Sequence, residues 1–302
     1  MPELPEVETM CRGIAPIIGR EIERVEVPPC HCRPITIEPS VRTLHRRLRG
    51  RAVTAIQRRG KRVMLCFDDR SRLVIEPRMT GLVLLADPPD PDHLRLRILF
   101  RPLSSPPTTP PHDIPTELLL WDRRGLGTIR WMSEQDYREK IDSRLGPDAM
   151  SITAEELRQN LAASRRPIKV ALLDQSAVAG IGNLYAAEIL FLAGVDPRTR
   201  CDRLTKPQWE RIHPAITLVL QDAIDHEGST LSDGTYRNAL NDPGNYQNMH
   251  RVYDRENLAC PRCEDGVIRR IVQAQRATFF CPGCQRKSGR HPSVAMPDNV
   301  RN

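Results

Sequence analysis

The sequence lacks any apolar run of about 20 residues, the length that a transmembrane helix requires. Its first residues also lack the basic and then apolar pattern of a secretory signal peptide. No internal repeat is present. These absences exclude a membrane-spanning helix and predict a soluble, cytoplasmic protein that has no membrane partner.

Disulfide bonds are also unexpected, because they are rare in the cytosol and the chain has nine cysteines, an odd number. Regularly spaced cysteines are therefore better candidates for metal ligands. At 302 residues the chain is long enough for two domains and a small module.

Lysine and arginine outnumber aspartate and glutamate by 45 to 38, which gives a formal charge of +7. Arginine dominates this excess, and guanidinium groups suit phosphate oxygens, so nucleic acid is the first partner to consider. A solvated basic surface would produce the same balance. The arginines cluster in pairs such as Arg46-Arg47, Arg58-Arg59, Arg123-Arg124 and Arg269-Arg270.

The chain begins with Met1 followed by Pro-Glu-Leu-Pro-Glu-Val-Glu. Loss of the initiator methionine would make Pro2 the N-terminus, a secondary amine able to attack a sugar or carbonyl carbon and form a Schiff base. An α-amino group is less basic than a lysine side chain, and Glu3, Glu6 and Glu8 could supply proton transfers. The same residues would also fit a mobile acidic segment.

Residues 1–135 show mainly β-type patterns after one N-terminal helix, which we expect at Glu8–Ile18. Many short strands at this spacing predict a sandwich or barrel. The Pro-rich stretches Ala86–Asp92 and Pro102–Pro115 are expected to be exposed loops. The strands are expected at Glu21–Val27, Ala52–Gln57, Val63–Phe67, Leu73–Glu76, Leu82–Leu85, Leu94–Phe100, Glu117–Trp121 and Thr128–Met132.

From about residue 151 the pattern becomes helical, which predicts a separate helical domain. Thr153 with Glu156 is a capping box that begins one helix. A Gly-Ile-Gly turn precedes a helix from Asn183 to Leu192, and Thr205 with Gln208 begins another helix that Pro214 should kink or divide. Glycines before a helix N-terminus allow an anion to approach, although helix joints also use them for steric reasons alone.

Two CxxC pairs, Cys260 with Cys263 and Cys281 with Cys284, are separated by seventeen residues. Each pair can place two thiolates on one turn, and a hairpin between the pairs would bring all four around one tetrahedral Zn²⁺. Four sulfur ligands leave no open position, so this zinc would be structural. The intervening arginines, among them Arg276, could contact phosphates, although a protein contact fits equally well. Cys30-His31-Cys32 has no second pair and is interpreted as an ordinary loop.

These features together resemble formamidopyrimidine-DNA glycosylase, a family of bifunctional base-excision enzymes related to endonuclease VIII. The resemblance extends from Pro2 to about Arg286. Its motifs occur in the family's order: the Pro2–Glu8 start, the basic Arg59-Gly60-Lys61 turn, the segment from Gly180 to Ala186, and the segment from Gln275 to Cys281. Taken alone, the basic turn would be interpreted as a solvated loop.

The resemblance implies an α+β fold with DNA bound in the cleft between two lobes. We expect a catalytic N-terminal β-sandwich domain (1–135), a helix-two-turn-helix DNA-binding domain (136–235), a lesion loop with the C-terminal zinc finger (236–286) and a basic tail (287–302). Double-stranded DNA containing oxidised bases or abasic sites is the implied partner. A monomer in the cytoplasm, associated with the nucleoid through DNA, is expected.

The resemblance also assigns roles to matching residues. Pro2 would attack C1′ of the damaged nucleotide, Glu3 would protonate the sugar ring oxygen, and Glu6 would support proton transfer. Lys61, Asn183 and Arg276 would contact phosphates around the lesion. Strand cutting would follow by β- and then δ-elimination.

A flipped nucleotide leaves a gap that the family fills with a Met, an Arg and a Phe. Met79 and Arg124 match the first two, but Leu126 stands where the family has Phe. Gly228–Asp233 matches the start of the loop that closes over oxidised guanine. The resemblance implies removal of oxidised purines, 8-oxoguanine and formamidopyrimidines. Two alternatives stay open: an endonuclease VIII-like preference for oxidised pyrimidines, and a damaged-DNA-binding paralogue without catalysis, against which the intact Pro2, Glu3 and Lys61 argue.

Overall fold

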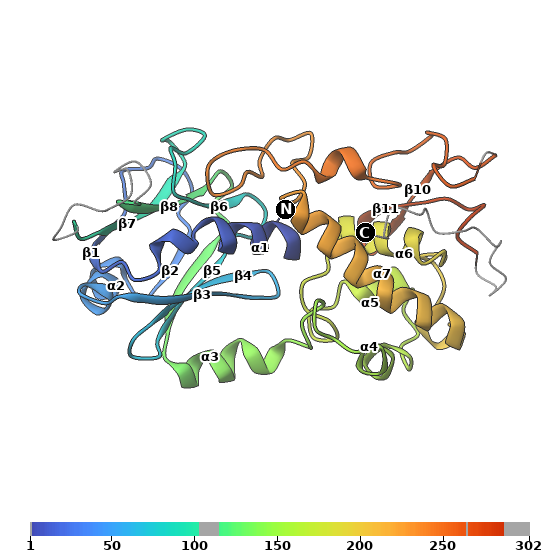
Figure 1. Cartoon of the computed structure of the whole chain (residues 1–302), viewed down its shortest axis with the longest axis horizontal. Helices are drawn as coiled ribbons and strands as arrows, with labels where there is room; N and C mark the ends of the chain where they lie inside the picture. The colour runs from blue at the N-terminus through green and yellow to red at the C-terminus, as the bar shows by residue number, and fades with distance from the viewer. Residues whose placement is uncertain (1, 103–114, 264, 287–302) are drawn as a thin grey trace, which may run out of the picture.

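The computed structural model describes residues 2–102, 115–263 and 265–286 and consists of two lobes (Figure 1). One lobe contains β-sheets, and the other contains helices and a small hairpin. The chain begins where the two lobes meet. The inner part of the Pro102–Pro115 insertion and the tail from Lys287 lie outside the described residues.

Two sheets form the first lobe, which confirms the predicted α+β class and its β-sandwich. One sheet has the antiparallel order β1 (Ile22–Glu26), β7 (Leu94–Phe100), β8 (Glu117–Asp122) and β6 (Gly81–Leu84). The other has the order β2 (Thr36–Glu38), β9 (Thr128–Met132), β5 (Arg72–Glu76), β4 (Arg62–Phe67) and β3 (Val53–Arg59), in which only β2 and β9 are parallel.

The eight predicted strands are present, each within two residues of its expected ends. Alternate residues of β7, such as Leu96 and Ile98, are buried in the core of this lobe with Leu65 and Leu73 of the other sheet. The sequence did not reveal β2 or the helices α2 (Val41–Leu48) and α3 (Glu134–Lys140).

The first helix, α1, spans Leu4–Gly13, so the predicted span of Glu8–Ile18 is wrong. Glu3 and Glu6 form a capping box, in which the Glu6 carboxylate accepts the Glu3 N–H at 2.8 Å, and this interaction begins the helix four residues earlier than expected. Glu8 lies inside α1 and pairs with Arg12 and Arg58. After Gly13 the chain continues as a short 3-10 turn, Ala15–Ile17.

The second lobe contains α4 (Ala154–Leu161), α5 (Ile168–Leu172), α6 (Asn183–Leu192) and α7 (Lys206–Asp225). The sequence predicted that Pro214 would kink or divide helix α7, and the helix is not divided there. Its buried face, which includes Trp209, Ile212 and Ile216, packs in the same core as α6. This burial keeps the helix intact although the proline has no backbone N–H to donate. Three further 3-10 segments lie at Asp142–Arg144, Cys201–Arg203 and Tyr246–Met249.

The C-terminal hairpin pairs β10 (Arg269–Gln273) with β11 (Arg276–Phe280) in antiparallel register. Ala274 and Gln275 both have positive φ, as a two-residue hairpin turn of this hand requires. Strand β11 packs on α6, where Phe279 and Phe191 share a small core with the four finger cysteines. In the described part of the chain, no helix is both long and apolar enough to cross a membrane.

Candidate active site and metal centre

A pocket between the lobes contains five of the residues singled out in the sequence. Glu3, Glu6 and Met79 line it from the first lobe, and Asn183 and Arg276 line it from the second lobe. Leu184, Ser229, Leu231, Asp233, Tyr253 and Ala277 complete the wall. Pro2 and Lys61 do not line this pocket. Pro2, which directly precedes Glu3 in the chain, is buried.

Glu3 joins the two lobes at the N-terminus of α6. Its carboxylate accepts the N–H of Leu184 at 3.0 Å, one of the amides that a helix leaves unpaired. A Cβ at position 182 would lie 2.1 Å from the Glu3 carboxyl carbon, so a larger residue there would displace the Glu3 carboxylate. The second glycine of the Gly-Ile-Gly turn therefore admits a carboxylate to the helix end.

Glu6 is buried and fully engaged in hydrogen bonds. Its carboxylate accepts the Tyr185 hydroxyl, the Ser229 N–H at 2.9 Å and the Glu3 N–H at 2.8 Å. Burial raises the pKa of Glu6, and the nearby Glu3 carboxylate raises it further. A carboxyl with a raised pKa can hold a proton and deliver it to a neighbour.

The basic turn between β3 and β4 is only partly free to contact a ligand. Arg58 bonds Asp148 at 2.6 Å, Arg59 bonds Asp142 at 2.8 Å and Arg62 bonds Glu76 at 2.9 Å. Among the ion pairs that the described residues form, none includes Lys61. The turn therefore uses three of its cations for structure and leaves one for another partner.

Lys61 lies close to the charged groups of the pocket. Loss of solvent around its amine lowers the pKa of Lys61, while the Glu3 carboxylate opposes this effect and the Arg276 guanidinium adds to it. Gly60, with φ of +57°, brings the turn against Ala179 of the second lobe. This contact places Lys61 at the junction of the lobes.

Asn183 and Arg276 are connected through the finger hairpin. The Asn183 side-chain amide donates to the Ala277 carbonyl at 3.1 Å, and Ala277 follows the exposed Arg276 at the start of β11. Asn183 is the first residue of α6, as the sequence predicts. A backbone carbonyl of the hairpin thus fixes the position of a pocket residue.

Lys169 was not predicted to be a site residue, although a lysine inside the apolar run of α5 is a sign of a buried charge. It is completely buried, and its amine donates to the Asn183 side-chain oxygen and to the Ala277 carbonyl at 3.2 Å. Burial lowers the pKa of Lys169 to about 8, and Arg276 lowers it as well.

We expect Lys169 to make stability depend on pH. Between its folded pKa of about 8 and its ordinary value of 10.5, the unfolded chain holds a proton that the folded chain has released, so the free energy of unfolding rises with pH. Urea unfolding at the two pH values that bound this window measures the rise in the free energy of unfolding. This rise should be larger in the wild type than in Lys169→Met by about 2 kcal/mol. Equal rises in the two proteins would contradict the shift.

Glu188 and Tyr253 were also missed, because their contacts join distant segments. The fully buried Glu188 carboxylate accepts the N–H groups of Arg251, Val252 and Tyr253 at 2.8 to 3.0 Å. This carboxylate fixes the segment that enters the finger, and Tyr253 projects from that segment into the pocket wall.

Met79, Arg124 and Leu126 lie on two loops that one carboxylate holds together. Asp122 accepts the Thr80 hydroxyl and the N–H groups of Arg124 at 3.1 Å and Leu126 at 2.8 Å. Arg124 is exposed and Leu126 is partly exposed, and neither lines the pocket. These side chains are therefore presented from neighbouring loops of the first lobe.

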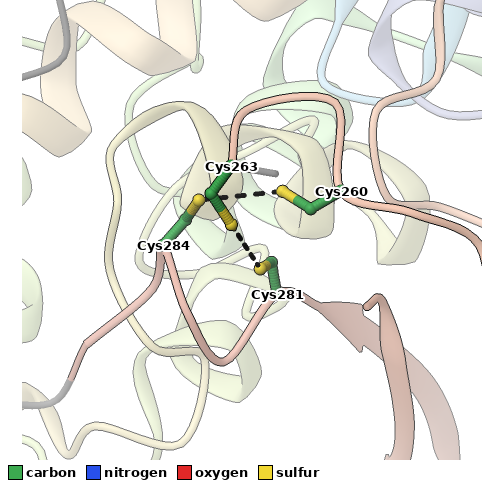
Figure 2. A group of neighbouring side chains, drawn as sticks. All are labelled: Cys260, Cys263, Cys281 and Cys284. Atoms are coloured by element: carbon green, nitrogen blue, oxygen red, sulfur yellow. Dashed lines mark hydrogen bonds between the residues drawn. The ribbon is translucent and has the colours of Figure 1, made fainter. Parts of the chain in front are cut away.

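The four finger cysteines form a cluster in which all the sulfur atoms lie within 4.8 Å of one another (Figure 2). The sulfur atoms of Cys260 and Cys284 are 3.7 Å apart, and so are those of Cys263 and Cys281. A tetrahedral zinc with Zn–S bonds of about 2.3 Å requires sulfur atoms about 3.8 Å apart, so the residues present fit this metal. A Cβ at Gly266 would lie 2.4 Å from the Cys263 sulfur, so a larger residue would close the site.

Two protein-family models match the chain. The formamidopyrimidine-DNA glycosylase N-terminal domain matches residues 1–129, and the formamidopyrimidine-DNA glycosylase H2TH domain matches residues 145–235. Among curated relatives, the formamidopyrimidine-DNA glycosylase of Chloroflexus aggregans is 38% identical over 298 residues. That alignment covers 94% of this chain and 98% of the relative.

Solved structures agree with this match. The crystal structure of the MutM (Fpg) protein from Thermus thermophilus has a TM-score of 0.79 at 34% identity, and the alignment covers 94% of this chain and 98% of that one. Lactococcus lactis Fpg in complex with abasic-site DNA has a TM-score of 0.80 at 31% identity, with 94% and 100% covered. The chain belongs to the formamidopyrimidine-DNA glycosylase family of DNA-repair enzymes.

Proposed function

We propose that this protein removes oxidised purines, 8-oxoguanine and formamidopyrimidines, from double-stranded DNA and then cuts the strand at the abasic site. The observation that carries this proposal is the pocket in which Glu3 and Glu6 face Asn183 and Arg276 from the opposite lobe. Solved relatives bound to DNA with an abasic site, Fapy-dG or carbocyclic 8-oxoguanine support it.

In the proposed mechanism Pro2, freed of Met1, attacks C1′ of the damaged nucleotide. The Pro2 nitrogen loses its proton, the bond from C1′ to the base breaks and the base leaves with a proton, while Glu3 protonates the sugar ring oxygen so that the ring opens to an imine in its cationic, iminium form. The imine acidifies the C2′ proton. Its removal expels the 3′ phosphate by β-elimination, and δ-elimination then expels the 5′ phosphate.

The surrounding residues would hold protons and phosphates. Glu6 would support the proton transfers beside Glu3, because its burial favours the protonated form and its carboxylate holds the Glu3 backbone N–H. Lys61, Asn183 and Arg276 would contact the phosphates around the lesion as cations or donors. A zinc ion held by Cys260, Cys263, Cys281 and Cys284 would stabilise the hairpin that carries Arg276.

Met79, Arg124 and Leu126 would enter the duplex where the damaged nucleotide leaves the stack. Their loops are held together by Asp122, so the three side chains would move as one unit. We also propose that the protein acts as a cytoplasmic monomer on nucleoid DNA.

Leu126→Phe should tighten binding to a lesion duplex. Leucine fills space between bases but lacks the aromatic face that stacks on them, a difference of about 0.5 to 1.5 kcal/mol. The dissociation constant for a duplex with 8-oxoguanine opposite cytosine should fall by about two- to tenfold when measured by fluorescence anisotropy. An unchanged or weaker affinity would show that Leu126 does not enter the base stack.

Strand cutting of a panel of duplexes tests the proposed substrate class. We expect cutting at 8-oxoguanine, formamidopyrimidine and abasic sites, with phosphates at both ends of the gap. Preferential cutting at oxidised pyrimidines would favour the endonuclease VIII-like alternative. Binding to all lesions without cutting would favour the non-catalytic one.

A further inference from the structure

Two cysteines that the proposed mechanism does not use lie beside a buried arginine. The Cys30 sulfur is 2.8 Å from an Nη atom of Arg95 and 3.4 Å from the backbone N–H of Cys32. Arg95 belongs to β7 and is only 4% exposed, whereas both cysteines are partly exposed. An arginine beside an accessible thiol is the environment in which cysteines react with oxidants.

Arg95 has an unusual set of partners for a buried cation. Its Nε donates to the Asp122 carbonyl at 2.8 Å, and its second Nη atom has no hydrogen-bond partner among the described residues. Within that part of the chain, no carboxylate forms an ion pair with it. The Cys30 sulfur therefore accepts a hydrogen bond from an otherwise poorly partnered cation, and it also lies 2.9 Å from the Asp92 carbonyl.

The same arginine connects the cysteines to the loop that carries Arg124 and Leu126. Asp122, whose carbonyl Arg95 holds, binds the backbone of that loop through its carboxylate. A Cβ at Gly125 would lie 2.3 Å from the Arg33 carbonyl, so the segment after Cys32 packs directly on the loop. A change at the cysteines therefore reaches the loop by two contacts.

We propose that Cys30 and Cys32 are a reversible oxidation site that takes a peroxide as its oxidant and forms a disulfide. The Cys30 sulfur attacks one peroxide oxygen, the O–O bond breaks and the first water leaves, which gives a sulfenic acid. The Cys32 sulfur then attacks the Cys30 sulfur and the second water leaves. The two thiols lose two protons and two electrons, and the peroxide is reduced to two waters.

The disulfide takes the Cys30 thiol away from Arg95 and leaves the buried guanidinium with fewer partners. The hold of Arg95 on the Asp122 carbonyl then weakens, and the Arg124–Leu126 loop loses its fixed position. We expect weaker binding to lesion DNA by about tenfold, the lower end of the effect of losing one hydrogen bond to a charged group. This consequence rests on the proposed function, whereas disulfide formation does not.

The test uses the full-length, zinc-loaded protein treated with hydrogen peroxide. Peptide mapping without reductant should show the Cys30–Cys32 peptide lighter by two hydrogen masses, with recovery after dithiothreitol. Cys32→Ser keeps the Cys30 contact with Arg95 but cannot close the disulfide, and Cys66→Ser removes a partly exposed thiol elsewhere. The wild type and Cys66→Ser should form the disulfide, and Cys32→Ser should not.

Binding is measured on the same samples with a duplex that contains an uncleavable abasic analogue, and zinc content is followed to detect oxidation of the finger. Loss of affinity in the wild type and in Cys66→Ser with zinc retained, and its absence in Cys32→Ser, supports the proposal. Absence of the Cys30–Cys32 disulfide overturns it. Disulfide formation with unchanged affinity overturns the link to the loop, and failure of the reduced protein to bind DNA overturns the proposed function instead.

Discussion

Glu3→Gln should reduce the rate of base excision by about 10²- to 10⁴-fold while DNA binding changes little. The glutamine oxygen can still accept the Leu184 N–H at the start of α6, so the join between the lobes is retained. The amide cannot, however, deliver a proton to the sugar ring oxygen. Single-turnover excision of 8-oxoguanine opposite cytosine, together with the dissociation constant, measures the two effects separately.

Glu8→Gln is the matched control for this variant. Glu8 lies on the same helix, but its carboxylate faces Arg12 and Arg58 and does not line the pocket. Its excision rate should stay within about twofold of the wild type, since a glutamine oxygen can still accept from Arg58, which keeps its bonds to Asp148, and the exposed pair with Arg12 contributes little. A Glu3→Gln enzyme as fast as Glu8→Gln would show that Glu3 transfers no proton in the reaction.

Cys260→Ala should abolish both zinc binding and high-affinity DNA binding. The energy of binding a structural zinc is folding energy, about 10 kcal/mol or more for small zinc modules, and a hairpin of this size has little other core. Unfolding of the hairpin removes Arg276 and the Ala277 carbonyl that holds Asn183. We expect zinc content near zero by atomic emission and affinity weaker by about 100-fold or more, as the loss of several phosphate contacts requires.

Cys66→Ala provides the control, because Cys66 lies in β4 of the other lobe and outside the cluster. It should keep its zinc and its affinity. A Cys260→Ala protein that binds lesion DNA normally without zinc would separate the finger from DNA recognition.

Local sequence signals predicted the elements that depend on neighbouring residues. The two CxxC pairs indicated the cysteine cluster, and the glycines before Asn183 indicated the start of α6, because each signal lies within a few residues. The predicted start of α1 was wrong for a related reason. A glutamate acts as the N-cap there in place of the usual serine or threonine, so Glu3 and Glu6 were interpreted only as chemical groups.

Contacts between distant segments could not be predicted from the sequence. Asp122 holds two loops together, but nothing around it distinguishes it from a surface carboxylate, and Glu188, which fixes the entry to the finger, left only the signal of being the single charge in the apolar helix α6. Lys169 did leave a signal as the one charge in an apolar helix. Helix α3 also left a signal in the sequence, because Ser133 is its N-cap and its side-chain oxygen accepts the Asp136 N–H.

The central claim is that the amine of Pro2 forms the imine with DNA. Borohydride reduction in the presence of a duplex with 8-oxoguanine opposite cytosine should trap a covalent protein–DNA adduct. Mass mapping should place the DNA on the peptide that begins with Pro2. No adduct with 8-oxoguanine, formamidopyrimidine or abasic-site DNA, or an adduct on Lys61 or Lys169, would contradict the account.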